Sequence, residues 1–344
     1  MATNGHTNGA AVHAHFRPLT PGVYAPIPAF FDAQTDELDI PTFETHVLRV
    51  ARAGVGLVIS GSMGEAHHLS HDERKLLIRT ARHALDTAEP SLSHVPIIAG
   101  TGGGSTRETI LLSKEAAEAG ADVAIVICSG YYAGALDKKA LTAFFTEVAD
   151  KSPIPVLVYN YPGAAGGIEL DSDLILSLAE HPNICGVKLT CGNVGKLTRI
   201  AAGVTPAAAF AKAYPRKHKE AATVPFLVLG GFIDFLVPSL YANAHGAITG
   251  LGNVAPNAIS HLYKLATDPS QLAEAQRLQG IIANGDRTVA LTGIGGTKYL
   301  LKRFYGYGGA PRRPLLPFEE ENGEKLWNHP HVVALLEEER KLTK

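Results

Sequence analysis

One lysine lies in a stretch of sequence that is otherwise apolar, small or β-branched. Residues 184–190 read Ile-Cys-Gly-Val-Lys-Leu-Thr, which predicts a short buried strand with Lys188 inside it. A buried ammonium loses its hydration and tends to become a neutral amine. A neutral amine attacks carbonyl carbons, which is the chemistry of Schiff-base enzymes. The alternative is a strand end that leaves Lys188 in water, and for these seven residues alone that is the commoner situation.

Residues with hydroxyl side chains lie at the ends of several other predicted strands. The set holds one amine and no Asp/Glu pair, so we expect no metal, since a metal-dependent aldolase needs carboxylate ligands. It favours an iminium mechanism, in which a protonated imine accepts electrons and hydroxyls relay protons. Taken singly, each residue also fits a structural role, as a turn residue or a strand aromatic. Besides Lys188, the strand-end residues are Ser62, Glu65, Tyr131, Tyr132, Tyr159, Tyr161 and Thr190.

Two further motifs suggest ligands but have simpler explanations. His67 and His71 have the four-residue spacing of a helical zinc pair. However, 70–73 forms a capping box, which places His71 at a helix start and favours a solvated helix end. The glycine-rich run 100–106 resembles a phosphate loop but lacks the Gly-Lys-Ser/Thr ending, so a tight barrel loop is favoured.

Eight predicted strands alternate with helices or helix-length connections. They are continuous apolar runs, which is typical of a parallel sheet covered on both faces. Eight such units over about 240 residues predict an α/β fold, a (β/α)8 TIM barrel. A doubly wound sheet is the alternative, but no Gly-x-Gly-x-x-Gly opens a helix after the first strand. The strands are 23–31, 55–60, 95–99, 122–128, 154–159, 184–190, 226–229 and 247–251.

The chain divides into three predicted parts. Residues 1–17 form a disordered tail, 18–254 the catalytic barrel, and 255–344 a C-terminal helical appendage. In the appendage, periodicity predicts helices at 272–283, 298–304 and 330–341. Residues 205–224, rich in Ala and Lys, have no assigned role.

Composition excludes several classes of protein. The 344 residues carry a net charge of −2, with a pI near 6.7, so we expect no nucleic-acid or anionic-membrane partner. No apolar run is long enough to cross a bilayer. The three cysteines form no CxxC pair and suggest a reducing compartment. The N-terminus lacks a secretory core and is a poor transit peptide, so we expect a cytoplasmic protein.

Five ordered motifs together resemble the dihydrodipicolinate synthase / N-acetylneuraminate lyase family of class I aldolases. Residues 61–65 match its Gly-x-x-Gly-Glu turn, 159–162 its Tyr-Asn-x-Pro segment and 186–188 its Schiff-base strand. Residues 100–102 and 130–132 also fit. The resemblance runs from about Pro18 to Pro317.

The resemblance implies a role for each matching residue. Lys188 would form an imine with the 2-oxo group of a small 2-oxo acid, without any cofactor. Tyr159 would be the proton shuttle, and Ser62 and Tyr132 would complete a proton relay with it. Tyr132 would reach this relay from a neighbouring subunit. The protein would then be a homo-oligomer, either a dimer or a tetramer. Backbone N–H groups of Ser62 and Met63 would hold the carboxylate. Thr190, Gly231 and Ile248 match positions that line the pocket.

At two positions the sequence departs from the family pattern, and these departures narrow the range of expected substrates. Ala164 stands where members that make lysine precursors have an arginine, which disfavours aspartate semialdehyde as a substrate. Met63 replaces a Thr or Asn side chain but keeps its backbone donor. The segments 148–155 and 304–309 look closest to eukaryotic 4-hydroxy-2-oxoglutarate aldolases and, equally, to fungal 2-keto-3-deoxy-sugar-acid aldolases.

The resemblance therefore predicts a lyase that cleaves a 4-hydroxy-2-oxo acid to pyruvate and an aldehyde. The substrate would be 4-hydroxy-2-oxoglutarate or a sugar acid such as L-threo-3-deoxy-hexulosonate. The alternatives are a dehydratase or hydratase acting on a keto-deoxy sugar acid through the same imine, and a non-catalytic 2-oxo-acid-binding relative.

Overall fold

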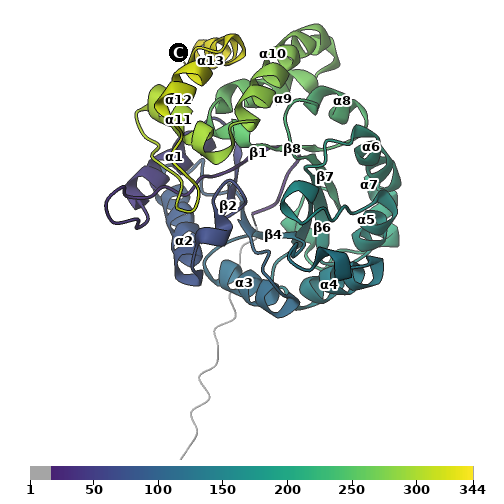
Figure 1. Cartoon of the computed structure of the whole chain (residues 1–344). Coiled ribbons are helices and arrows are strands. Elements are labelled where there is room, and N and C mark those ends of the chain that lie inside the picture. Colours follow the sequence, from purple (N-terminus) through teal and green to yellow (C-terminus); the bar gives the residue numbers. More distant parts are fainter. Residues whose placement is uncertain (1–16, 344) are drawn as a thin grey trace, which may run out of the picture.

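Eight parallel strands close into a barrel in chain order in the computed structural model, which describes residues 17–343 (Figure 1). This confirms the predicted TIM barrel. The strands are apolar along their length because their residues pack on both faces, inside the barrel and under the helices. The strands are β1 (Gly22–Pro26), β2 (Gly56–Ile59), β3 (Ile97–Gly100), β4 (Val123–Ile127), β5 (Val156–Asn160), β6 (Ile184–Leu189), β7 (Leu227–Gly230) and β8 (Gly246–Ile248).

Helices follow the strands and surround the barrel, and side-chain caps fix where several of them begin. Asp39 accepts the Thr42 N–H at the start of α1, and Ser70 forms the predicted capping box of α2. At α3, Ser105 accepts the Glu108 N–H, whereas the Glu108 side chain binds His71 and not the helix start. The helices are α1 (Ile40–Arg52), α2 (His71–Ala88), α3 (Thr106–Glu118), α4 (Lys138–Lys151), α5 (Ser172–Ala179), α6 (Val194–Gly203), α7 (Ala207–Ala213) and α8 (Leu236–Tyr241).

The barrel interior has its own small core, separate from the larger core between strands and helices. Tyr24, Ile98, Leu157, Leu229 and Ile248 belong to it, all buried. Tyr159 belongs to the same cluster and lies at the carboxyl end of β5. The interior is therefore filled with side chains, and free space is left at the strand ends.

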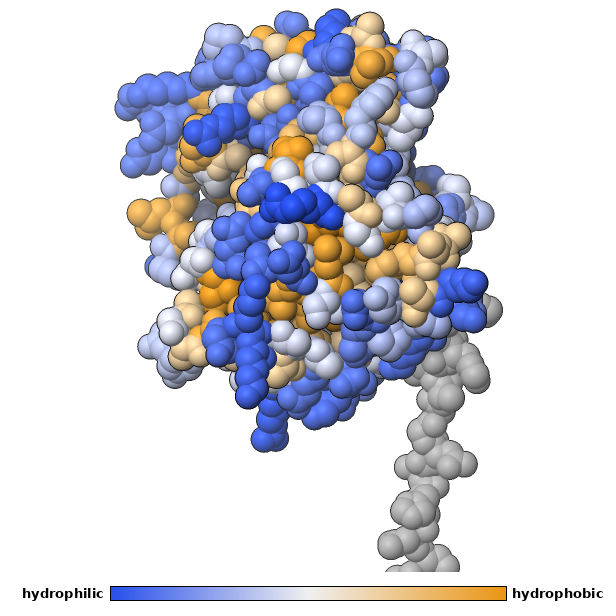
Figure 2. Space-filling view, turned by 90° about the vertical axis from the view of Figure 1, so that its right-hand side faces the viewer, coloured by the Kyte–Doolittle hydropathy of each residue, from blue (hydrophilic) through white to orange (hydrophobic). Residues whose placement is uncertain are grey.

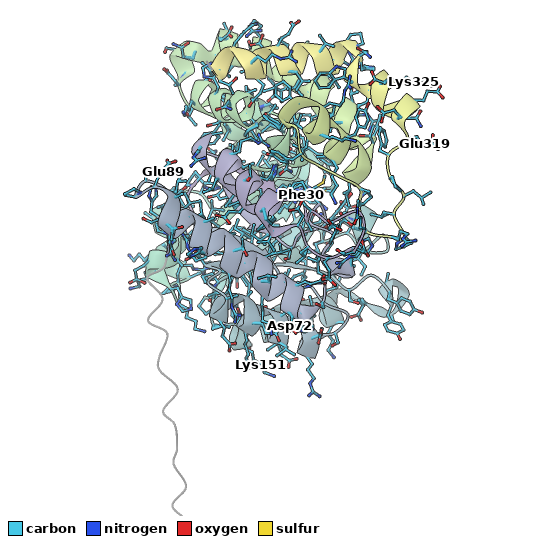
Figure 3. All side chains as sticks on the ribbon, turned by 90° about the vertical axis from the view of Figure 1, so that its left-hand side faces the viewer. Phe30, Asp72, Glu89, Lys151, Glu319 and Lys325 are labelled. Atoms are coloured by element: carbon cyan, nitrogen blue, oxygen red, sulfur yellow. The ribbon has the colours of Figure 1, made fainter. Side chains whose placement is uncertain are left out.

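The C-terminal helices pack against one side of the barrel. Figure 3 places Phe30 between the barrel and these helices, where its ring contacts His46 and Tyr307, with centroids 5.3 and 5.9 Å away. Helix α9 packs against β1 and α8, and α10 packs against α9 and α13. The five helices are α9 (Pro256–Ala266), α10 (Leu272–Ala290), α11 (Gly293–Tyr305), α12 (Glu320–Trp327) and α13 (Pro330–Leu342).

Two of these helices extend beyond the ranges that periodicity predicts. Helix α10 continues past residue 283 to Ala290, although Asn284-Gly285 resembles a helix end. Gly285 allows close packing there, since a Cβ would lie 2.9 Å from the Leu335 side chain of α13. Helix α11 begins at Gly293 rather than at Lys298, through a first turn rich in glycine.

Other differences lie at the ends of elements. Strand β1 stops at Pro26 instead of residue 31, since Pro28 has no N–H for the ladder. Residues 205–224 contain α7 and a short 3₁₀ turn, Lys219–Ala221.

Figure 2 shows apolar side chains exposed between hydrophilic ones on the face that carries α5, α6 and α7.

The predicted N-terminal tail falls largely outside the described residues. Arg17, its last residue, is described, and its Nε donates to Ser93 O at 2.7 Å. The division of the chain at residue 254 stays a prediction. Among the described residues, no helix is long and apolar enough to cross a membrane.

Candidate active site

Lys188 and Tyr159 lie side by side at the carboxyl ends of neighbouring strands. Strands β5 and β6 pair in a register that sets Tyr159 opposite Lys188. Both residues are only 6% exposed, and the Lys188 Nζ lies 4.3 Å from the centroid of the Tyr159 ring. Within the described residues, neither the amine nor the Tyr159 hydroxyl has a hydrogen-bond or ion-pair partner. An amine and a phenol are thus close together and both are free to react.

The other buried lysines of residues 17–343 differ from Lys188 in having carboxylate partners. Lys196 Nζ contacts Glu169 Oε1 at 2.5 Å, and Lys298 Nζ contacts Glu65 Oε1 at 2.7 Å. Buried charges are usually paired in this way. The exposed-strand-end interpretation of Lys188 is wrong, because the side chain is buried. The missing carboxylate is what sets Lys188 apart.

The turn after β2 carries two backbone N–H groups that are free to donate, at the same end of the barrel as Lys188. It is held by bonds from Glu65 N to Ser62 O (3.1 Å) and from Ala66 N to Gly61 O (3.2 Å). The N–H groups of Ser62 and Met63 donate to no other described residue. Adjacent free N–H groups form a concavity that suits an anion such as a carboxylate.

Gly231 follows β7 and approaches Thr190 at the end of β6 very closely. A Cβ on Gly231 would lie 2.0 Å from Thr190 Oγ1 and 2.5 Å from Thr190 Cα, so only glycine fits. The Thr190 hydroxyl is buried and has no hydrogen-bond partner in the described chain. A buried hydroxyl without a partner beside a cavity is available to a bound ligand.

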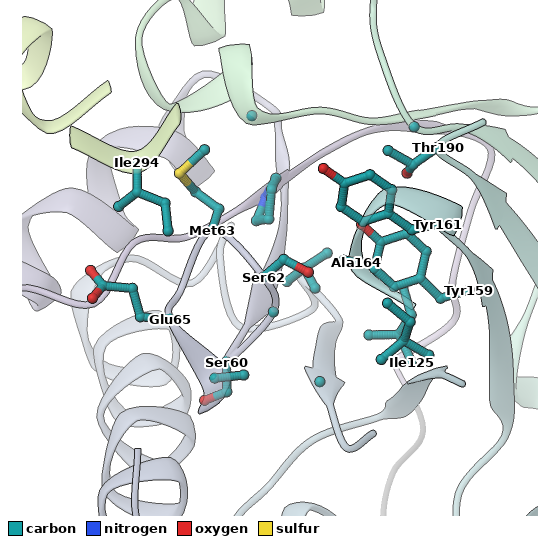
Figure 4. A pocket seen from close by; sticks show the side chains of 18 of the residues that line it. Ser60, Ser62, Met63, Glu65, Ile125, Tyr159, Tyr161, Ala164, Thr190 and Ile294 are labelled. Atoms are coloured by element: carbon teal, nitrogen blue, oxygen red, sulfur yellow. The ribbon is translucent and has the colours of Figure 1, made fainter. Parts of the chain in front are cut away.

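These groups open into one cavity of about 410 Å³. Figure 4 shows Tyr159 and Tyr161 on one side of the cavity, Met63 and Ile294 on the other, and Ser62 between them. The predicted site residues that line it are Lys188, Tyr159, Ser62, Met63, Thr190 and Gly231.

The structure places two predicted site residues outside this cavity. Ile248 is fully buried in the barrel interior and does not line the cavity. Tyr132 is 67% exposed, and its ring contacts that of Tyr131, with centroids 4.9 Å apart. One chain alone therefore does not bring Tyr132 to Lys188.

Other residues also line the cavity: Tyr161, which the sequence analysis names only as a strand-end residue, and Ser60 and Asp286, which it does not name. Tyr161 stacks on Tyr159 with centroids 5.7 Å apart, and burial raises the pKa of its hydroxyl. Ser60 is buried with φ +55° and has no described partner for its hydroxyl. Asp286 comes from the part of α10 that periodicity missed. Strand-end position could have singled out Ser60, but no local signal points to Asp286.

The two histidines whose spacing suggested a metal pair have different surroundings and different partners. His71 contacts Glu115 and Glu108 at 2.6 and 2.7 Å, and these hydrogen bonds raise its pKa. His67 lines the cavity, and burial lowers its pKa. No group of three or more potential metal ligands occurs among residues 17–343.

A (β/α)8 barrel with a buried lysine on its sixth strand, beside a tyrosine on the fifth, has the architecture of a class I aldolase. The chain belongs to the dihydrodipicolinate synthetase family, whose model matches residues 31–329. The family resemblance inferred from the motifs is thereby confirmed.

Individual relatives share nearly the whole chain. It is 44% identical over 318 residues to the L-threo-3-deoxy-hexylosonate aldolase of Aspergillus niger, covering 90% of this chain and 94% of that protein. It is also 44% identical over 307 residues to a protein of Emericella nidulans named "Probable 4-hydroxy-2-oxoglutarate aldolase, mitochondrial", covering 89% and 92%.

A solved structure shows the same fold. YagE, an Escherichia coli K12 prophage protein of the dihydrodipicolinic acid synthase family, was determined in complex with pyruvate. It has a TM-score of 0.78 and 29% identity to this chain, covering 94% of this chain and 99% of YagE.

Proposed function

We propose that the protein is a lyase, a class I aldolase that cleaves a 4-hydroxy-2-oxo acid to pyruvate and an aldehyde. The observation that carries this is the Lys188 amine, buried beside Tyr159 without a carboxylate partner. Two relatives with 44% identity are named as aldolases of such acids, and YagE holds pyruvate.

The reaction begins at the Lys188 amine. Its Nζ adds to the 2-oxo carbon, and the resulting hydroxyl leaves as water with the proton of the Tyr159 phenol, which gives a protonated imine and a Tyr159 phenolate. The Tyr159 oxygen takes the proton of the substrate 4-hydroxyl as the C3–C4 bond breaks, which releases the aldehyde. The electron pair of that bond moves to the imine and forms an enamine. Protonation at C3 and hydrolysis then release pyruvate and restore the amine.

The neighbouring groups hold the substrate for these steps. The free N–H groups of Ser62 and Met63 bind the substrate carboxylate, and the Ser62 hydroxyl passes protons to and from Tyr159. The Thr190 hydroxyl binds an oxygen near C4, with Gly231 leaving space beside it. Ile248 supports this wall from inside the barrel.

The active form is a homo-oligomer, a dimer or a tetramer, in which Tyr132 of one copy completes the relay of another. Exposure of both Tyr131 (87%) and Tyr132 (67%) supports this, because such rings are usually covered in an interface. Light scattering of wild type and Tyr132→Arg tests it. Dissociation of the variant together with loss of turnover is the expected outcome.

Borohydride reduction in the presence of pyruvate tests the mechanism directly. A stable adduct on the peptide that contains Lys188 is expected in wild type and absent in Lys188→Ala. Lys196→Arg changes another buried lysine and should keep the adduct. If wild type forms no adduct on Lys188, the mechanism is wrong.

Product analysis separates the aldolase from its alternatives. An aldolase releases pyruvate from a sugar acid, whereas a dehydratase or hydratase using the same imine releases or adds water and leaves the carbon chain intact. A non-catalytic binder would form the pyruvate adduct without turnover of any acid.

Two properties complete the proposal. The enzyme needs no cofactor beyond the lysine imine. It acts in the cytoplasm, although one relative carries "mitochondrial" in its name. The N-terminal residues that would hold a targeting signal lie outside the described part of the chain, so fractionation of cells that express the full chain is the direct test.

A further inference from the structure

A series of contacts between neighbouring residues connects Lys188 with a second part of the cavity lining. Thr190, two residues further on β6, touches Gly231 in the turn after β7. In the same turn the Ile233 N–H donates to Asp286 Oδ2 at 3.2 Å, and Asp286 lines the cavity. Asp286 therefore lines the same cavity as Lys188 and the β2 turn, and it is connected to Thr190 through the turn after β7.

The carboxyl group of Asp286 is buried close to a second carboxyl group. It is 4% exposed, and the Asp234 carboxyl lies close by on the turn that Asp286 holds. Burial, together with that second carboxyl, raises the pKa of Asp286 to about 7. A carboxyl with a raised pKa takes up a proton more readily, and in its protonated form it can donate to a hydroxyl as well as accept from one. Toward a second substrate carboxylate its ionised form is repulsive.

The cations that line the cavity do not offset this repulsion. The terminal nitrogens of Arg74 donate to the backbone oxygens of Gly100, at 3.3 Å, and Ala66. Burial and the nearby Arg74 lower the pKa of His67, which is therefore neutral at pH 7. The His68 Nδ1, also at the cavity, is hydrogen-bonded to Glu65 Oε2 at 3.0 Å. Lys188 is consumed by the imine. Ala164 lines the cavity without a charge.

The rest of this wall is apolar, with few polar groups. Helices α10 and α11 contribute Val289, Ala290 and Ile294, and Thr297 adds a hydroxyl. A mostly apolar wall with a carboxyl and hydroxyls matches a chain of carbons that carry hydroxyl groups.

We propose that Asp286 is a substrate-binding residue that selects an uncharged polyhydroxy chain beyond C4. The substrate class is then a 2-oxo-3-deoxy sugar acid and not a 4-hydroxy-2-oxo diacid. This inference rests on the proposed aldolase function and adds the substrate class and the residue that sets it.

The test compares two substrates on the same enzyme preparations. Wild type, Asp286→Asn and Asp286→Ala are each assayed for pyruvate release from a 2-keto-3-deoxy hexonate and from 4-hydroxy-2-oxoglutarate. Because both rates come from the same sample, their ratio does not depend on the folded fraction. Asn284→Ala, an exposed position on α10, is the matched control.

We expect wild type to favour the sugar acid in kcat/KM by about tenfold or more. Asp286→Asn and Asp286→Ala should raise KM for the sugar acid by about tenfold and leave the diacid unchanged or improved. Asn284→Ala should behave as wild type. Preference of wild type for the diacid, or an equal loss on both substrates, would overturn the inference.

Borohydride trapping separates this failure from failure of the proposed function. An adduct on Lys188 with no change of substrate ratio in the Asp286 variants would reject the role of Asp286 and leave the aldolase proposal standing. Absence of the adduct in wild type would reject both.

Discussion

The Nζ of Lys298 lies 2.7 Å from Oε1 of Glu65, and both side chains are fully buried. Glu65 ends the turn that carries Ser62 and Met63, with φ +55°, and its second oxygen accepts the Arg312 N–H at 2.8 Å. Burial lowers the pKa of Lys298, and the Glu65 carboxylate opposes that change. This ion pair therefore ties the turn after β2 to α11, so the C-terminal helices help to shape the site.

Removal of one partner of this pair should be costly. Lys298→Met leaves the Glu65 carboxylate buried without its cation, and we expect a loss of about 3–5 kcal/mol in the free energy of unfolding. KM should rise as well, because the turn loses a support. Denaturant unfolding measures the loss, with Lys302→Met, an exposed lysine of α11, as the control. Equal stability of the two variants would mean that the pair contributes little.

Tyr159→Phe should act on the chemical step. The ring remains beside the Lys188 amine, but the oxygen that moves the proton is removed. We expect kcat to fall by about 10²–10⁴-fold with a small change in KM. The pyruvate adduct on Lys188 should still form under borohydride. A variant with wild-type kcat would exclude Tyr159 as the proton shuttle.

Gly231→Ala tests the close approach to Thr190. The new Cβ would overlap Thr190 Oγ1 at 2.0 Å, so the two strand ends must move apart. We expect a loss of about 1–3 kcal/mol in stability and a clear fall in kcat/KM. Gly280→Ala, at a helical position with open space around it, should instead stabilise by up to about 1 kcal/mol. Thermal melting and kinetics on both variants distinguish the two cases.

His71 should make stability depend on pH. Hydrogen bonds that the His71 ring donates to the carboxylates of Glu108 and Glu115 raise its pKa above the ordinary 6.5, so folding favours its protonated form. Its contribution is complete below about pH 6.5 and is lost as pH rises through the raised pKa. Between pH 6 and 9, wild type should lose more stability in denaturant titrations than His71→Gln. His83→Gln, on the exposed face of the same helix, should follow wild type.

Removal of metal should leave the activity unchanged. The proposed electron sink is the imine of Lys188, so dialysis against EDTA should not alter kcat/KM. A metal-dependent aldolase would lose activity and regain it on addition of a divalent cation. Recovery of that kind would contradict the Schiff-base proposal.

Local sequence determined the barrel and the reacting pair. Each strand of the structure is a mostly apolar run of three to six residues, and each cap is read over three or four positions, so residues close in sequence suffice to predict them. Because the carboxyl ends of parallel strands meet at one face, the places of Lys188, Tyr159, Ser62 and Thr190 followed from the strand count.

Only the tertiary structure decided which residues α10 and α11 place in the wall of the cavity. Asp286 meets Ile233 across 53 positions of the chain, and Lys298 meets Glu65 across 233. Periodicity ends the predicted helix at residue 283, yet α10 continues to Ala290, and its Gly285 packs closely against Leu335 of α13. Such contacts depend on how helices pack against each other, which local periodicity does not encode. The sequence therefore determines where the imine forms, and the packing of the C-terminal helices decides what surrounds the rest of the substrate.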